Sequence, residues 1–214
     1  MKPDYILFTD GSSITEKNKV MQYAASSFLV INNHMKTCAK DAHPIGSGDS
    51  ARAELFAICG GLKYIASRIK KGQNKTVLVL SDSQYSINLI EKHLLRWYEG
   101  KRVTDKAIAR FESDLTMFRT LAKLMSKPNM RVTFIHIKSH MGDGGAGYIK
   151  RKFKDSGFNI SRTVAFEMIM NNREVDRMAR EETAKLAKQC GIDTPTIKLL
   201  EQDDQEGGVW NDIG

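Results

Sequence analysis

The sequence lacks the long apolar run of a membrane-spanning helix and the leader of a secreted protein. None of its apolar runs approaches the roughly 20 residues that a membrane span needs. The apolar stretch within the first ten residues, MKPDYILFTD, is far shorter than the core of a signal peptide and meets an acid at once. Because both features are missing, we expect an intracellular protein with no membrane partner.

Paired cysteines are also missing. Cys38, Cys59 and Cys190 are odd in number and far apart, and none forms the C-x-x-C spacing of a zinc or redox site. This excludes a disulfide framework and a cysteine-bound metal, and we interpret the three as reduced thiols.

Positive charge is missing from one end of the chain. Residues 201–214 (EQDDQEGGVWNDIG) carry five acids and no Lys or Arg, so residues 1–200 hold all 33 Lys and Arg but only 20 of the 25 acids. A body this basic favours a polyanionic partner such as nucleic acid, although a membrane surface or simple solubility would also account for it. The acidic tail, residues 193–214, has no periodicity and is predicted to be flexible. It could be offered to a protein partner or fold back onto the basic body.

Strand patterns dominate the first part of the chain. Residues 5–10, 23–32 and 34–41 predict three strands, and the close spacing of the last two favours an antiparallel meander. From residue 50 to residue 69 apolar residues recur at intervals of three and four, which predicts an amphipathic helix. The continuous apolar run at residues 76–82 then predicts a strand buried on both faces.

Helices and one more strand fill the second part. Helical periodicity covers residues 83–97 and 108–125, and residues 131–140 predict a fifth strand. Four glycines at residues 141–147 predict a mobile loop, and a long helix follows over residues 162–189. The order of elements predicts an α/β protein whose five-stranded mixed sheet, an antiparallel three-strand meander plus parallel strands, is flanked by helices.

Four acids lie at positions in these elements that could form one site. Asp10 and Asp82 end two predicted strands, Glu54 falls in the first turn of a helix, and Asp176 lies inside the last helix. Each has an ordinary explanation, because aspartates form turns after strands and a first-turn acid favours the helix dipole. Glu54 and Asp176, however, lie beside the apolar stripes of their helices, where a lone carboxylate would lose its hydration.

The four carboxylates converge if the first and fourth strands are parallel neighbours, since the carboxyl ends of such strands form the ligand crevice of doubly wound sheets. Carboxylates gathered there raise one another's pKa values unless cations lie between them. Such a cluster predicts a divalent metal site. Spacing alone does not prove that all four meet.

Four short segments surround these acids: FTDGSS (residues 8–13), RAEL (52–55), SDSQYSIN (81–88) and NNREVDRMARE (171–181), with IKSH (137–140) before the last. They resemble the four signature segments of type I ribonuclease H, in the same order and each on the expected element. The resemblance covers about residues 4–190. It implies a ribonuclease H-like fold, with residues 1–192 as one catalytic domain.

The resemblance also implies roles for individual residues. Asp10, Glu54, Asp82 and Asp176 are similar to the family's four metal-binding catalytic carboxylates, and His140 is similar to its mobile histidine, which assists proton transfer and product departure. Substrate contacts are implied for residues that flank the acids, namely Gly11, Ser12, Ser83 and Gln84 through the minor groove, and Asn172. Gly11 has a physical reason as well, because backbone without a Cβ can approach a phosphate or ribose closely.

The implied activity is metal-dependent endonucleolytic hydrolysis of the RNA strand of RNA/DNA hybrids, which leaves 3′-hydroxyl and 5′-phosphate ends. Two Mg²⁺ ions, or Mn²⁺, would be the cofactor, and the hybrid would be chosen by shape and 2′-hydroxyl contacts. The expected partner is therefore the hybrid. We expect a monomer in the cytoplasm or wherever the genome is replicated.

One basic segment is similar to a shortened form of the handle with which some family members hold the duplex. It contains Trp97, Lys101 and Arg102, which we predict to bind substrate. A solvated connection between helices explains these residues nearly as well.

A second basic segment is an insertion at about residues 141–162, where the family has a short loop. Its YIKRKFK run interleaves four cations with two aromatic residues: Lys150, Arg151, Lys152 and Lys154 with Tyr148 and Phe153. This composition predicts a basic loop or flap that grips phosphates and stacks on bases. A merely soluble flap is the alternative.

Two rival functions remain as alternatives. Proofreading-type exonucleases on a related fold carry an Asp-x-Glu pair on the first strand, whereas Asp10 is followed by Gly11 and Ser12. A non-catalytic hybrid-binding module would be expected to lack one of the acids, and all four are present. Both observations favour the nuclease.

Overall fold

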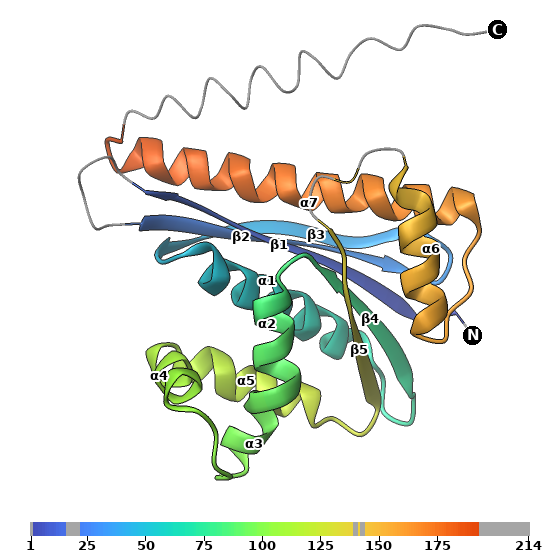
Figure 1. Ribbon diagram of the computed structural model, residues 1–214, viewed down its shortest axis with the longest axis horizontal. Coiled ribbons are helices and arrows are strands. Elements are labelled where there is room, and N and C mark those ends of the chain that lie inside the picture. Colours follow the sequence, from blue (N-terminus) through green and yellow to red (C-terminus); the bar gives the residue numbers. More distant parts are fainter. Residues whose placement is uncertain (1, 16–21, 139–140, 142–143, 193–214) are drawn as a thin grey trace, which may run out of the picture.

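The structure is a computed structural model that describes residues 2–15, 22–138, 141 and 144–192. Figure 1 shows a twisted sheet with helices on both faces. The strands are β1 (Tyr5–Thr15), β2 (Gln22–Asn32), β3 (Thr37–Ser47), β4 (Lys75–Ser81) and β5 (Met130–His136). The helices are α1 (Ser50–Arg68), α2 (Gln84–Leu89), the π-helical turn η1 (Ile90–Leu94), α3 (Leu95–Tyr98), α4 (Asp105–Ser113), α5 (Leu115–Met125), α6 (Gly145–Asp155) and α7 (Arg162–Gln189).

The sheet has the strand order β3-β2-β1-β4-β5. β1 and β2 are antiparallel, as are β2 and β3, whereas β4 runs parallel to both β1 and β5. This confirms the predicted five-stranded mixed sheet with an antiparallel meander. It also makes the first and fourth strands parallel neighbours, which is the condition for Asp10 and Asp82 to meet.

Alternation along the central strands divides the core into two layers. Leu7 of β1 packs under α1 and α5 on one face, and Ile6 and Phe8 pack under α6 and α7 on the other. β4 is buried on both faces, as its continuous apolar run predicted. The central strands are therefore covered on both sides, and Figure 1 shows the helices that cover them.

Several predicted boundaries were wrong for local reasons. The predicted strand at residues 34–41 begins only at Thr37, because the Asn32 side chain accepts hydrogen bonds from the amides of His34 and Lys36 and makes a turn there. The predicted helix at residues 108–125 is two helices, because the backbone of Asp114 leaves the helical region between α4 and α5. β1 continues past Asp10 to Thr15, so Asp10 lies within a strand rather than at its end.

The insertion was predicted to be a loop or flap, and the structure corrects this. α6 begins at Gly145, inside the glycine run, and ends at Asp155. Ala146, Ile149 and Phe153 recur at helical spacing and are buried against the layer that contains α7. The apolar stripe outweighs the low helix propensity of the glycines, so the insertion is part of the core.

Two further expectations concern membrane spans and the acidic tail. Within the described residues, no helix combines the length and the apolar character needed to cross a bilayer. The acidic tail at residues 193–214, with its predicted flexibility and protein partner, lies outside the described residues.

The backbone of α1 lies close against β1 at Gly11. A Cβ added to Gly11 would lie 2.4 Å from the backbone nitrogen of Glu54 and 2.7 Å from the carbonyl carbon of Ala53. Backbone atoms cannot move aside as a side chain can. Glycine is therefore required here by helix packing, a reason that differs from the predicted approach of a substrate.

We expect Gly11→Ala to lower the free energy of unfolding by about 2 kcal/mol or more, as overpacking does in a close-packed core. Urea unfolding measures this change. The matched control is Gly147→Ala on α6, where an added Cβ meets no atom within 4 Å, and it should leave stability unchanged or slightly higher. Equal stability of the two variants would contradict the packing role of Gly11.

Candidate metal centre

At one end of the sheet, β1 extends beyond its neighbour β4. β4 pairs with β1 only over residues 77–80 against residues 5–8, while β1 runs on beside β2 to Thr15. Asp10 belongs to this unpaired part of β1, and Asp82 directly follows the last residue of β4. The two aspartates thus lie at the carboxyl ends of parallel strands, where ligand sites form in α/β proteins.

α1 brings the third carboxylate to the same place. Its first turn is capped by Asp49, whose side chain accepts a hydrogen bond from the amide of Arg52, and Glu54 follows just after that turn. Glu54 is only 4% exposed, and its two oxygens accept hydrogen bonds from the amide of Gly11 at 2.9 Å and from the hydroxyl of Ser81 at 3.3 Å. The amide of Gly11 also donates to Asp10 Oδ1 at 2.8 Å. One backbone donor therefore holds two of the carboxylates.

Three of the four predicted carboxylates meet. Asp10, Glu54 and Asp82, called the acidic triad below, each place one oxygen so that the three lie within 4.8 Å of one another. Asp176 comes from α7 and is not part of this group; its carboxylate forms an ion pair with Arg180, one helical turn further on. It is still near enough for its charge to raise the pKa of both Asp10 and Asp82.

The triad is electrostatically unfavourable as it stands. Burial, with the charges of Asp82 and Asp176, raises the pKa of Asp10 to about 7. Burial and the charge of Asp10 raise the pKa of Glu54 well above its ordinary value, and burial also raises that of Asp82. The Arg side chains near the start of α1 pair with other acids, Arg52 with Asp114 and Arg110 with Asp49. The charge of His136 acts in the opposite direction on Asp82 and partly offsets its raised pKa.

Carboxylate oxygens at this separation match the preferences of hard divalent cations. Mg²⁺ and Mn²⁺ take oxygen ligands, and one or two carboxylates suffice for Mg²⁺ when the substrate and water supply the rest. The donor set of the triad therefore fits the predicted cofactor. The raised pKa values agree, since a bound cation would favour the charged form of carboxylates that burial and neighbouring acids disfavour.

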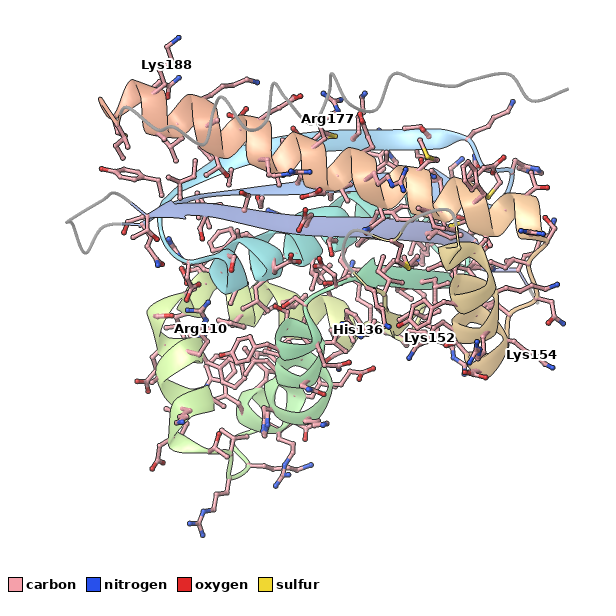
Figure 2. All side chains as sticks on the ribbon, turned by 45° about the horizontal axis from the view of Figure 1, so that its top comes forward. Arg110, His136, Lys152, Lys154, Arg177 and Lys188 are labelled. Carbon is pink, nitrogen blue, oxygen red and sulfur yellow. The ribbon has the colours of Figure 1, made fainter. Side chains whose placement is uncertain are left out.

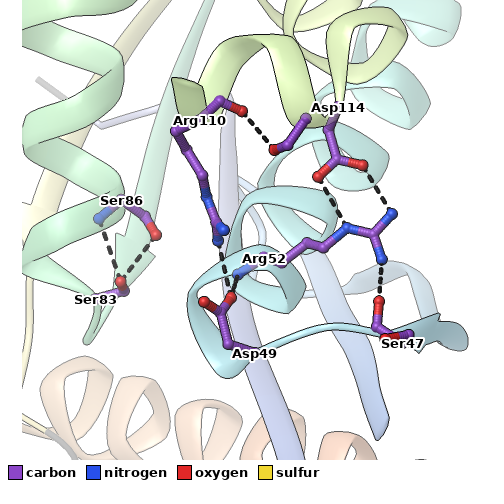
Figure 3. Close-up of polar contacts among 8 residues, drawn as sticks. Ser47, Asp49, Arg52, Ser83, Ser86, Arg110 and Asp114 are labelled. Carbon is purple, nitrogen blue, oxygen red and sulfur yellow. Dashed lines mark hydrogen bonds and ion pairs between the residues drawn. The ribbon is translucent and has the colours of Figure 1, made fainter. Parts of the chain in front are cut away.

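A network of ion pairs fixes the start of α1 (Figure 3). Arg52 binds both oxygens of Asp114 at 2.7 and 2.8 Å, and its guanidinium also donates to the carbonyl of Ser47. Arg110 binds the capping residue Asp49 at 2.8 Å. The network ties the first turn of α1 to the junction of α4 and α5. Its central residue, Arg52, is two residues before Glu54.

Two residues at the site were missed by sequence reasoning. Ser81 donates to Glu54, and His136 Nε2 lies 3.0 Å from the carbonyl oxygen of Asp82. Ser81 and His136 are register partners in the β4–β5 pair. The signal that could have found them is this pairing, because a residue beside the last residue of β4 must lie next to Asp82.

Several of the residues predicted to contact substrate around the acids have structural contacts. The carbonyl of Ser12 accepts a hydrogen bond from Thr183 of α7, and the hydroxyl of Ser83 caps α2 by accepting from the amide of Ser86 (Figure 3). Gln84 is exposed at the start of α2, whereas Asn172 is buried on α7. His140 lies outside the described residues.

The residues of the predicted handle and flap are divided between core and surface. Trp97 packs on the core with its ring 4.8 Å from that of Phe111, while Lys101 and Arg102 are exposed. In α6, Lys150, Arg151 and Lys154 are exposed and Lys152 is half-buried. Phe153 is fully buried, so it cannot stack on a base as predicted.

A sequence profile of the RNase H family matches residues 2–184. No curated protein matches the chain. Among solved structures, the RNase H domain of prototype foamy virus is 18% identical with a TM-score of 0.58, over 86% of this chain and 96% of that domain. The N-terminal RNase H domain of Rv2228c from Mycobacterium tuberculosis is 14% identical with a TM-score of 0.53, over 88% and 99%.

A longer protein has the same fold within it. A foamy viral protease–reverse transcriptase, solved in complex with an RNA/DNA hybrid, is 14% identical with a TM-score of 0.57, over 85% of this chain but 20% of that one. The chain thus spans about a fifth of the length of that relative. At these identities the likeness concerns the fold, and it confirms the predicted fold class.

The raised pKa values predict how stability depends on pH. A carboxyl whose pKa is higher in the folded than in the unfolded state contributes most stability at low pH and loses it as the pH rises through the folded value, which for Asp10 is about 7. Without divalent ions, the free energy of unfolding should therefore fall between pH 5.5 and pH 8. In Asp10→Asn this fall should be smaller by about 2 kcal/mol, because each pKa unit corresponds to about 1.4 kcal/mol. Urea unfolding in EDTA measures it, and a gap between the two proteins that does not vary with pH would contradict the assignment.

Proposed function

The chain is a nuclease of the RNase H family, and on that premise we propose that it hydrolyses the RNA strand of RNA/DNA hybrids with divalent metal ions held at the acidic triad. The products would carry 3′-hydroxyl and 5′-phosphate ends. The observation that carries the proposal is the meeting of Asp10, Glu54 and Asp82 at one end of the sheet, where burial raises the pKa of each.

The metal ligands would be the triad, with Asp176 completing the site on the side of α7. Mg²⁺ is the preferred candidate and Mn²⁺ the alternative, and two ions would accord with four carboxylates. Divalent ions bound there would supply Lewis-acid stabilisation of phosphate charge and a water of lowered pKa as nucleophile.

The protein's own contribution is to hold the carboxylates in place before substrate arrives. Glu54 is fixed by Gly11 and Ser81, and Asp10 by the same amide of Gly11. The ion pairs of Arg52 and Arg110 keep the start of α1 in position. A prearranged set of ligands needs little reorganisation during the reaction, which lowers the barrier.

Two observations support an RNA/DNA hybrid as the substrate. The chain carries a strongly basic body, which suits a polyanion. The foamy viral relative was solved with an RNA/DNA hybrid, although the same protein was also solved with double-stranded DNA. The proposed contacts to the hybrid remain Gly11, Ser12, Ser83, Gln84 and Asn172. Gln84, at the start of α2, is the most exposed of these side chains.

We expect Asp10→Asn to lower the rate of hybrid cleavage by at least about a hundredfold, because the substitution removes a charged ligand worth several kcal/mol of transition-state stabilisation. The assay uses labelled RNA/DNA hybrid beside double-stranded RNA, double-stranded DNA and single-stranded RNA, each with Mg²⁺ and with EDTA. Cleavage should be confined to the RNA strand of the hybrid and should stop in EDTA. The control is Asp41→Asn on β3, an exposed aspartate paired with His43. Near-normal cleavage by Asp10→Asn would refute the proposed site.

Metal binding can be tested without activity. At pH 8, added Mg²⁺ should raise the thermal midpoint of the wild-type protein, because a ligand that binds only the folded state stabilises it. The rise should be much smaller in Asp10→Asn, and Asp41→Asn should behave as the wild type. If Mg²⁺ shifts all three proteins equally, the triad does not hold the ion.

A further inference from the structure

α6 and the residues after β5 bring an aromatic ring and two ammonium groups together near His136, which contacts Asp82. The Tyr148 hydroxyl donates to the carbonyl of His136 at 3.4 Å, and His136 Nε2 lies 3.0 Å from the carbonyl of Asp82. Two contacts thus connect the inserted helix to a member of the acidic triad. The burial of Ile149 and Phe153 fixes α6 against the core, so the position of Tyr148 is set by packing.

Two lysines are held at the Tyr148 ring. The Lys138 ammonium, two residues after β5, lies 5.5 Å from the ring centroid, and the Lys152 ammonium, one turn further along α6, lies 5.6 Å from it. Both distances are within the range of a cation–π interaction. Lys138, Tyr148 and Lys152 are called the Tyr148 cluster below.

Within the described part of the chain, the cluster carries two positive charges that no acid pairs with. Within the described residues, neither Lys138 nor Lys152 forms an ion pair, whereas surface cations on α7 such as Arg177 and Lys185 are paired with neighbouring glutamates. Two ammonium groups on one ring repel each other, and an anion between or beside them would remove that repulsion. Phosphate is the anion that a polymer substrate at the neighbouring triad would bring.

The rest of the basic run faces elsewhere. Lys150 and Lys154 follow the buried stripe of α6 on its other flank, since side chains advance about 100° per residue. Figure 2 shows Lys152 on the side of α6 nearer to His136 and Lys154 pointing away from it. The seven-residue run predicted as one clamp is therefore divided by the helix into a flank that faces the site and a flank that does not.

We propose that the Tyr148 cluster is a phosphate-binding surface that holds one strand of the nucleic-acid substrate beside the acidic triad. The two ammonium groups contact phosphates, and the Tyr148 ring orients them rather than stacking on a base. This inference rests on the proposed function for the identity of the polymer. It adds a substrate-positioning role to Lys138, which lies outside the basic run, and to Tyr148.

The test removes the two charges together. Lys138→Ala/Lys152→Ala should weaken binding of a labelled hybrid in EDTA by at least about fivefold and reduce the slope of log affinity against log salt by about 1.5, since each lost phosphate contact removes about 0.7–0.9. With Mg²⁺ present, KM should rise by a similar factor while kcat changes little. The matched control, Lys127→Ala/Arg131→Ala, removes two exposed charges at the opposite end of β5 and should keep the wild-type slope.

Two further variants separate the cluster from general charge. Tyr148→Leu removes the ring and should lower affinity part of the way, while Tyr148→Phe keeps the ring and should bind as the wild type. Lys150→Ala/Lys154→Ala should cost clearly less than Lys138→Ala/Lys152→Ala. Equal losses for these two pairs, or an unchanged salt slope in Lys138→Ala/Lys152→Ala, would overturn the proposal.

The experiments distinguish a wrong assignment of the Tyr148 cluster from a wrong assignment of the activity. If the wild-type protein binds hybrid in EDTA with the expected dependence on Lys138 and Lys152 but does not cleave it, the cluster stands and the proposed activity falls. If it cleaves hybrid and Lys138→Ala/Lys152→Ala keeps the wild-type affinity and KM, the activity stands and the cluster falls.

Discussion

The candidate centre depends on the close approach of α1 to β1 at Gly11. The amide of Gly11 donates to both Asp10 and Glu54, and a Cβ at this position would overlap the backbone of α1. The same contact therefore packs the helix on the sheet and holds two carboxylates together. Neither carboxylate can move away without losing a hydrogen bond, and the helix cannot move without opening the core.

This constraint gives the triad its electrostatic character. Packing keeps the three carboxylates close, although burial above all, and then the charge of neighbouring acids, raises the pKa of each. A cation that relieves the repulsion is bound more tightly for the same reason. Asp176 differs because it is paired with Arg180 on its own helix. It adds negative potential from α7 without sharing the hydrogen bonds that lock Asp10 and Glu54.

Much of the fold and of the centre could be predicted from the sequence, because the strongest patterns were local. The continuous apolar run of β4 and the helical period of α7 predicted the right element types. The hypothesis that the first and fourth strands are parallel neighbours, each ending on an aspartate, placed Asp10 beside Asp82. Glu54 followed from its place beside an apolar stripe. What the sequence could not show depended on tertiary context: the ring of Trp97, which is predicted to bind substrate, also packs on Phe111, a contact that no local pattern encodes.

The inserted helix is a second example of structure that depends on tertiary context. The glycines of residues 141–147 predicted a loop, although Ala146, Ile149 and Phe153 already had helical spacing, because a short stripe is easily outweighed by glycine content. Once these three residues are buried, the direction of every other side chain of α6 follows, and the basic run can no longer act as one surface. Composition alone could say that the insertion is basic and aromatic. Only the register of the helix against α7 and β5 decides that Tyr148 and Lys152 lie on the flank toward His136, where we propose that an anionic polymer meets the acidic triad and the two ammonium groups side by side.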